Sequence, residues 1–137
     1  MLMPSKYGNA KPKYKGKRFD SGLEMCRYIY LQDQERKGRI SNLRRQVRYQ
    51  VLPAQYERPQ YITNGRGKKM PKPKVKERAV VYIADFVYTY NGVDVVEDAK
   101  GVRTDAYILK RKLMLYFHDI SIYEVENAAD PIGGDRV

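Results

Sequence analysis

An Asn-Gly dipeptide at positions 91 and 92 constrains this chain more than any other feature of its sequence. It separates residues 77–90, which are rich in Val, Ile, Tyr and Phe, from a second candidate strand at residues 93–100. Asn-Gly between two such segments is the strongest short-range signal for a two-residue β-hairpin turn, because both turn positions need positive φ. The sequence therefore predicts an antiparallel hairpin of fixed register.

This register brings two carboxylates together. If Tyr90 faces Val93, counting along the ladder places Asp85 opposite Asp98. Lys100 follows two residues later on the same face. Like charges directly opposite each other destabilise a sheet, and an unpaired carboxylate within an apolar strand is costly. We therefore expect a cation here, and two carboxylates with open coordination positions suit Mg²⁺ or Mn²⁺.

A divalent ion at this place would support hydrolysis of a phosphodiester, because it polarises the phosphate and generates hydroxide from bound water. Lys100 is placed to orient or deprotonate that water, or to stabilise the phosphate. Two structural alternatives stay open: Asp85 and Asp98 share a proton, or Lys100 bridges them as an ion pair. The same alternation also puts Ile83 and Val87 on the face of Asp85, and a register slip of one residue would separate the acids.

Two helices and two further strands complete the expected fold. Residues 20–38, and a segment capped by Thr104, carry apolar side chains at helical spacing, and residues 46–52 and 120–125 have the character of short strands. The order is α-β-β-β-α-β, in which the last strand pairs in parallel through a right-handed connection. We expect one α/β domain with a mixed β-sheet flanked by helices. The predicted inner faces comprise Leu23, Cys26, Ile29 and Tyr30 in the first helix, and Ala106, Leu109, Leu113 and Phe117 in the second.

The composition excludes several classes of protein. One cysteine and one histidine are too few for a structural zinc site or a disulfide scaffold, so Cys26 is expected to be a buried, reduced thiol. No apolar segment approaches the roughly 20 residues that cross a bilayer. Residues 1–11 carry no apolar signal-peptide core. We therefore expect a soluble, cytoplasmic protein without a membrane partner.

The net charge of +11 is concentrated in two segments. Residues 1–18 hold six Lys or Arg and no acid, and residues 57–78 hold eight Lys or Arg and two acids. Both are rich in Gly, Pro and Lys, so we interpret them as a flexible arm and a long loop of a single domain at residues 19–137. They are either phosphate contacts or solvated segments that aid solubility. The candidate nucleic-acid-binding residues are Lys13, Lys15, Lys17, Arg18, Arg66, Lys68, Lys69, Lys72, Lys74 and Lys76, with Lys110 on the second helix.

These acids, in this order of elements, resemble the PD-(D/E)XK nuclease superfamily over residues 19–125. Shorter strings are similar to a phage and prophage family of Holliday-junction-resolvase-like endonucleases. Ala84 stands where the motif has Pro, and Asp98 where it often has Glu; neither change removes a metal ligand. The strings are Lys6-Tyr7-Gly8-Asn9, Phe19-Asp20-Ser21 with Glu24, Tyr82-Ile83-Ala84-Asp85-Phe86, and Asp98-Ala99-Lys100-Gly101 with Thr104.

The resemblance implies a Mg²⁺-dependent DNA endonuclease that acts on branched or structured DNA in a bacterial host. Asp85 and Asp98 would bind the metal, the carbonyl group of Ala99 would add a ligand, and Lys100 would serve the attacking water. Glu24 would be the acid supplied by the helix, as a further metal ligand or as a support for bound water. Paired cuts in a symmetric junction need two active sites, so the resemblance also implies a homodimer.

Glu24 has a second interpretation, because residues 21–24 fit a Ser-x-x-Glu capping box, in which the glutamate only satisfies a backbone N–H. Gln46, at the start of a strand, either contributes to the site or hydrogen-bonds at the strand end. Two rival functions remain for the whole chain: a non-catalytic basic module that binds DNA or RNA, and a basic structural protein that packs on RNA or a larger assembly.

Overall fold

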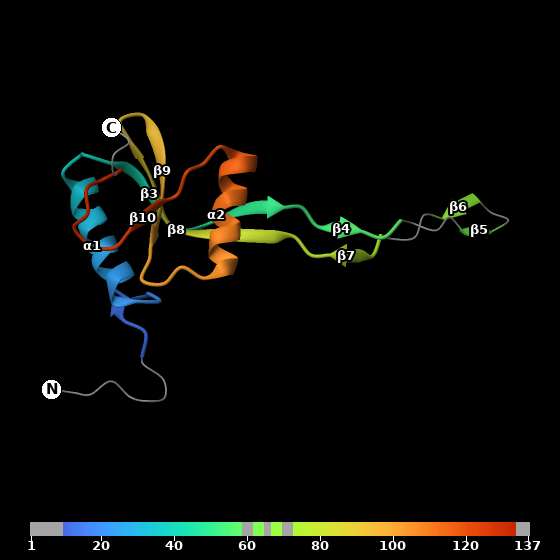
Figure 1. Cartoon of the computed structure of the whole chain (residues 1–137), viewed down its shortest axis with the longest axis horizontal. Coiled ribbons are helices and arrows are strands. Elements are labelled where there is room, and N and C mark those ends of the chain that lie inside the picture. Colours follow the sequence, from blue (N-terminus) through green and yellow to red (C-terminus); the bar gives the residue numbers. More distant parts are fainter. Residues whose placement is uncertain (1–9, 59–61, 65–66, 70–72, 134–137) are drawn as a thin grey trace.

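The protein contains a mixed four-stranded β-sheet. The computed structural model describes residues 10–58, 62–64, 67–69 and 73–133. The strand order is β10-β9-β8-β3, with antiparallel β3–β8 and β8–β9 pairs and a parallel β9–β10 pair. Helices α1 and α2 pack on opposite faces (Figure 1), so the expected α/β class and element order are confirmed. The bounds are α1 (Gly22–Arg36), β3 (Ser41–Leu52), β8 (Val80–Tyr90), β9 (Val93–Ala99), α2 (Asp105–His118) and β10 (Tyr123–Val125).

The hairpin between β8 and β9 has the predicted turn. Asn91 and Gly92 both adopt positive φ, at 50° and 77°. The ladder pairs Tyr90 with Val93 and continues to Phe86 with Glu97. The register predicted from the sequence is therefore confirmed up to the pair that precedes the two aspartates.

Regular alternation along β8 breaks at Asp85. Tyr82 and Ala84 pack in the same core cluster as Val87, on the α2 side of the sheet. Ile83 is 42% exposed, so the expectation that it shares a face with Val87 is wrong. The neighbouring edge strand β3 is also irregular nearby, since Gln46 has a φ of 52°. Because of this local change of face, Asp85 lines a cavity and does not pack in the core.

Helix α1 buries a different face from the one that its apolar residues predict. Cys26 is exposed and Ile29 is 37% exposed, whereas Arg27 is fully buried. The reason is a buried ion pair: Arg27 Nη2 donates to Glu97 Oε2 at 2.9 Å, across the sheet face. A buried cation is tolerated only with a partner, and here the partner lies on β9. The expected buried thiol is therefore wrong.

Helix α2 begins as predicted, with the Thr104 hydroxyl accepting from the Tyr107 N–H, but its inner face is rotated. Tyr107 and Met114 are buried, while Leu109 and Phe117 are 58% and 52% exposed and Ala106 is exposed. Of the predicted residues, Leu113 alone packs against the core cluster. Arg111 on the same helix pairs with the sheet, since its Nη1 lies 3.2 Å from Oε1 of Glu124 in β10.

Both basic segments contain strands and are not wholly irregular. The arm forms a hairpin of β1 (Lys13–Tyr14) and β2 (Lys17–Arg18). The loop is a two-stranded ribbon that continues β3 and β8 outward, through β4 (Gln55–Tyr56) paired with β7 (Val75–Glu77). It projects away from the sheet, with β5 (Ile62–Asn64) and β6 (Gly67–Lys69) paired farther out (Figure 1). Within the described ranges, neither helix has the length and apolar character needed to span a bilayer.

Candidate functional site

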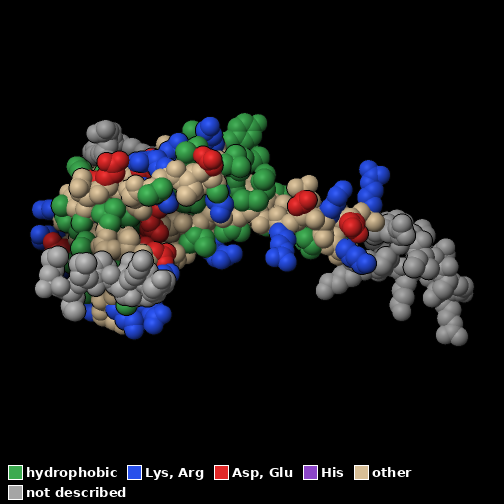
Figure 2. Space-filling model, turned by 60° about the horizontal axis from the view of Figure 1, so that its bottom comes forward, with side chains coloured by type: hydrophobic (Ala, Val, Ile, Leu, Met, Phe, Trp, Pro, Cys, Tyr) green, Lys and Arg blue, Asp and Glu red, His purple; other side chains and the backbone are tan. Residues whose placement is uncertain are grey.

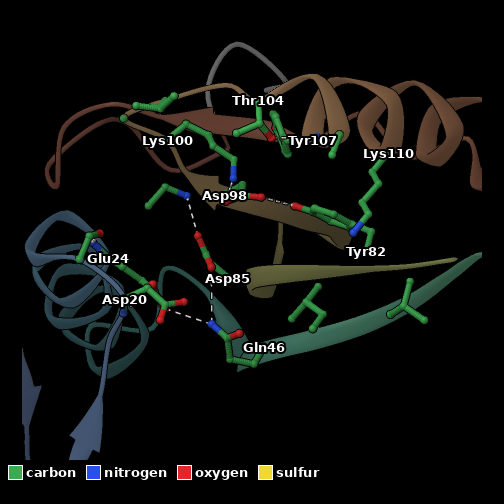
Figure 3. Close-up of a pocket in the computed structure, with 17 residues that line it drawn as sticks. Asp20, Glu24, Gln46, Tyr82, Asp85, Asp98, Lys100, Thr104, Tyr107 and Lys110 are labelled. Atoms are coloured by element: carbon green, nitrogen blue, oxygen red, sulfur yellow. Dashed lines mark hydrogen bonds and ion pairs between the residues drawn. The ribbon is translucent and has the colours of Figure 1, made fainter. Parts of the chain in front are cut away.

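Five elements of the fold surround one cavity of about 530 Å³. The start of α1 supplies Glu24, β3 supplies Gln46, β8 supplies Asp85, and the end of β9 supplies Asp98. Lys100 follows β9 directly, and the first turns of α2 close the other side (Figure 3). The structure therefore brings together the acids and the lysine that the hairpin register predicts.

Asp85 is held by the opposite hairpin strand, because its Oδ2 accepts a 3.0 Å hydrogen bond from the Ala99 N–H. Burial, and then hydrogen bonding and repulsion from Asp98, raise the pKa of the Asp85 carboxyl to about 8. A carboxyl whose pKa is raised in this way keeps its proton to a higher pH than a free carboxyl does. The two acids thus converge at one place in the cavity.

Asp98 is almost fully buried and has two partners. The Tyr82 hydroxyl donates to its Oδ2 at 2.6 Å, and Lys100 Nζ lies 3.2 Å from its Oδ1. Lys100 also makes a cation–π contact, since its Nζ lies 4.0 Å from the centre of the Tyr107 ring. Burial and the adjacent Asp98 also raise the pKa of Tyr82, so this phenol stays a hydrogen-bond donor. Lys100 thus pairs with one acid and does not bridge both.

Glu24 performs part of the capping role and also reaches the site. Its backbone N–H donates to Ser21 Oγ at 3.1 Å, as in a capping box, while its Oε2 accepts from the Asp20 N–H at 3.3 Å. Its Oε1 accepts from Gln46 Nε2 at 3.0 Å, and the same nitrogen lies 3.5 Å from Asp85 Oδ1. Burial raises the pKa of Glu24 despite the Asp20 N–H. One amide group therefore links the helix acid to the hairpin acid.

Tyr82 is a member of the site that the sequence analysis missed. Regular alternation from Asp85 puts Tyr82 on the opposite face, and only the break in alternation turns its hydroxyl to Asp98. Its place three residues before Asp85 was the available signal, but Tyr88 and Tyr90 in the same strand make a tyrosine there unexceptional. Its role depends on the local geometry of β8.

The donor set fits a divalent ion that keeps water ligands. Among the described residues, no three Asp, Glu, His or Cys side chains lie close enough to hold a metal by themselves. Two carboxylates, Asp85 and Asp98, do converge, and Mg²⁺ commonly takes one or two carboxylates and completes its shell with water and phosphate oxygens. Glu24 is joined to this pair through Gln46, so its position suits a water-mediated contact.

Comparison with known proteins identifies the family but no activity. A family model described as "Protein of unknown function (DUF1064)" matches residues 4–128. The chain belongs to the DUF1064 family. No curated protein and no solved structure matches it. The match contains the helix acid, both aspartates and the lysine, so the whole cavity lies within the part that defines the family.

The predicted basic residues of this DUF1064 chain fall into three places. Lys110 reaches from α2 into the cavity, toward Tyr82 (Figure 3). Lys13, Lys15, Lys17 and Arg18 lie exposed on the β1–β2 hairpin, where Lys17 Nζ donates to Tyr28. Lys74 and Lys76 are exposed on the ribbon. Arg66 and Lys72, and the side chains of Lys68 and Lys69, lie outside the described residues.

Proposed function

We propose that this protein is a Mg²⁺- or Mn²⁺-dependent DNA endonuclease that hydrolyses phosphodiester bonds, with a PD-(D/E)XK-type site. The observation that carries the proposal is the pair Asp85 and Asp98, pressed together at an open cavity with Lys100 beside them. Two adjacent buried carboxylates repel each other unless a cation or a bound proton offsets the charge, and perturbed acids in a cleft mark candidate functional sites. The net charge of +11 supports a polyanionic substrate.

Each residue of the cavity has a role in this proposal. Asp85 and Asp98 hold the metal, with the Ala99 carbonyl as a further ligand. The bound ion supplies polarisation of the phosphodiester and a lower pKa for a coordinated water. Lys100 Nζ, held against the Tyr107 ring, orients the attacking water or stabilises a non-bridging phosphate oxygen. Tyr82 keeps the Asp98 carboxylate in a single orientation through its hydroxyl.

Glu24 and Lys110 serve the same reaction from the two helices. Glu24 holds a water next to the metal and is oriented by Gln46, whose amide contacts Asp85 as well. Lys110 enters the cavity from the opposite side and meets the phosphate backbone of the strand that is cut. A helix acid on one wall and a helix lysine on the other define a path for one DNA strand.

Branched DNA as the substrate, a homodimer that makes paired cuts, and action in the cytoplasm of a phage host rest on the resemblance to resolvase-like endonucleases. The test is a panel of a four-way junction, a flap, a duplex and single-stranded DNA, each with Mg²⁺ or with EDTA. We expect the junction to be cut fastest, in Mg²⁺ alone, with loss of cleavage in Asp98→Ala. Cleavage that persists in EDTA or in Asp98→Ala would contradict the metal mechanism.

A second candidate function is a non-catalytic nucleic-acid-binding module. It is favoured by the absence, among the residues described, of three metal-ligating side chains in one cluster, and by the exposed cations of the ribbon and the hairpin. This function predicts salt-dependent binding of DNA or RNA that is indifferent to Mg²⁺. Equal affinity in Mg²⁺ and in EDTA, with no cleavage of any substrate in the panel, would favour it.

A further inference from the structure

The ribbon formed by β4 and β7 has no core of its own. Every described residue from 55 to 58 and from 73 to 78 is exposed. Two strands in isolation are marginally stable in water, and the described part of this ribbon continues β3 and β8. Large side chains kept on such an element are not explained by packing. They include Tyr56 and Val75, which are 57% and 53% exposed.

The ribbon carries two kinds of exposed side chain. Lys74, Lys76 and Arg78 lie in β7 or directly next to it, and all three are exposed. The β4–β7 register shifts between Gln55 and Tyr56, so regular alternation does not assign these cations to one face. Figure 2 shows Lys and Arg side chains on both sides of the ribbon where it leaves the body, with acidic side chains between them. Tyr56 and Val75 pair across the two strands and form an exposed apolar pair among these charges.

We propose that this ribbon enters a groove of duplex DNA beside the cavity, with Lys74, Lys76 and Arg78 against the phosphates and Tyr56 with Val75 toward the base edges. The major groove of B-DNA admits a two-stranded β-ribbon. The deep, narrow major groove of A-form RNA would not admit the ribbon.

The position of the ribbon defines where the contact falls. Asp85, Ile83 and Val81 line the cavity, and the same strand direction leads from them into β7. Lys76 is nine residues from Asp85, which in extended chain is about 30 Å, or about nine base pairs of duplex. The ribbon therefore contacts an arm of the substrate close to one helical turn from the bond that is cut.

The inference extends the proposed function, because it takes duplex arms around a cutting site as the substrate, but its test needs no catalysis. Binding is measured in EDTA by fluorescence anisotropy, on four-way junctions with arms of about 6 or about 16 base pairs closed by loops. The test variant combines Lys74→Gln, Lys76→Gln and Arg78→Gln. The matched control combines Arg36→Gln, Lys37→Gln and Arg39→Gln, which removes the same charge from exposed residues at the far end of α1.

On long arms we expect the ribbon variant to bind at least tenfold more weakly than wild type. The slope of the logarithm of the binding constant against the logarithm of the salt concentration should be smaller in magnitude by about three. On short arms it should match the control variant, because the arm ends before it reaches the ribbon. Tyr56→Ala should weaken long-arm binding severalfold and leave the salt slope unchanged. Circular dichroism and thermal unfolding of each variant confirm that the sheet is intact.

Equal losses for the ribbon and control variants, equal losses on both arm lengths, no binding by wild type, or tighter binding to an RNA junction would each overturn the inference. Binding that depends on the ribbon, without cleavage in Mg²⁺, would reject the nuclease function and support the ribbon contact. Cleavage together with binding that does not depend on the ribbon would support the nuclease function and reject the ribbon contact. The two proposals thus fail separately.

Discussion

Gln46 Nε2 lies 3.0 Å from Oε1 of Glu24, which joins the first turn of α1 to the edge strand β3. The same nitrogen lies 3.5 Å from Asp85 Oδ1, so Glu24 takes part in the acidic site although it also accepts the Asp20 N–H near the helix start. The two interpretations of Glu24 that the sequence left open are therefore both represented in its contacts. Substitutions of Glu24 and Ser21 distinguish the capping role of the glutamate from its role in the acidic site.

Glu24→Gln should reduce DNA cleavage by at least 100-fold while it changes the free energy of unfolding by less than about 1 kcal/mol, because the side chain keeps its length and one acceptor. Ser21→Ala is the matched control. It removes the N-cap acceptor and should cost about 1 kcal/mol of stability with cleavage retained. Urea unfolding and initial cleavage rates measure the two effects. Full activity in Glu24→Gln would leave the glutamate with a capping role alone.

The stability of the metal-free protein should fall as the pH rises. Burial and the adjacent Asp98 raise the pKa of Asp85 from 3.8 to about 8, so the folded state holds a proton that the unfolded state releases. The contribution of this group is fully present below the ordinary carboxyl range and is lost as the pH rises through the folded value. Between about pH 5 and about pH 8.5, the melting temperature in EDTA should therefore drop further in wild type than in Asp85→Asn.

Asp94→Asn, an exposed change on the same hairpin, should keep the wild-type pH dependence. Added Mg²⁺ should stabilise the wild type most at high pH, because bound metal and bound proton compete for the same carboxyl. Identical pH dependence in wild type and Asp85→Asn would show that Asp85 titrates normally. It would also remove the argument that the two acids are held together against their repulsion.

The buried Arg27–Glu97 ion pair should dominate the stability of the α1 side of the sheet. Both side chains are fully buried, and Arg27 Nη1 also donates to the Ala128 carbonyl at 3.0 Å. Arg27→Met should cost about 3–5 kcal/mol, because it leaves the buried Glu97 carboxylate without its counter-charge, with only the Tyr88 hydroxyl still donating to it among the described contacts. Arg27→Met with Glu97→Leu should recover much of that loss. Arg36→Met, on the exposed end of the helix, should be nearly neutral in the same urea titrations.

The hairpin and its acid pair could be predicted from the sequence because the determinants are local. Asn91 and Gly92 fix the turn type, the turn type fixes the register, and the register brings the ladder to Phe86 and Glu97, the pair next to Asp85 and Asp98. Thr104 marked the start of α2 for the same reason, since a cap needs only its own neighbours. No information from distant parts of the chain was required.

The buried faces of the helices could not be predicted, because partners distant in sequence decide them. The buried Arg27 pairs with Glu97 and with carbonyl groups of residues 128–131, and the half-buried Arg111 pairs with Glu124. Apolar periodicity therefore pointed to Leu109, which is 58% exposed. The ribbon was missed for a different reason: cations occupy the alternating positions from Lys74 to Arg78, so its period of two carries no hydrophobic signal.

The central claim, that Asp85 and Asp98 together hold a divalent ion, is tested most directly by calorimetric titration of Mn²⁺ into the wild type and into Asp85→Asn and Asp98→Asn. We predict a saturable site in the wild type, a loss of at least tenfold in affinity in each variant, and proton release on binding that is abolished in Asp85→Asn. No Mn²⁺ uptake by the wild type, or unchanged affinity in both variants, would contradict the account.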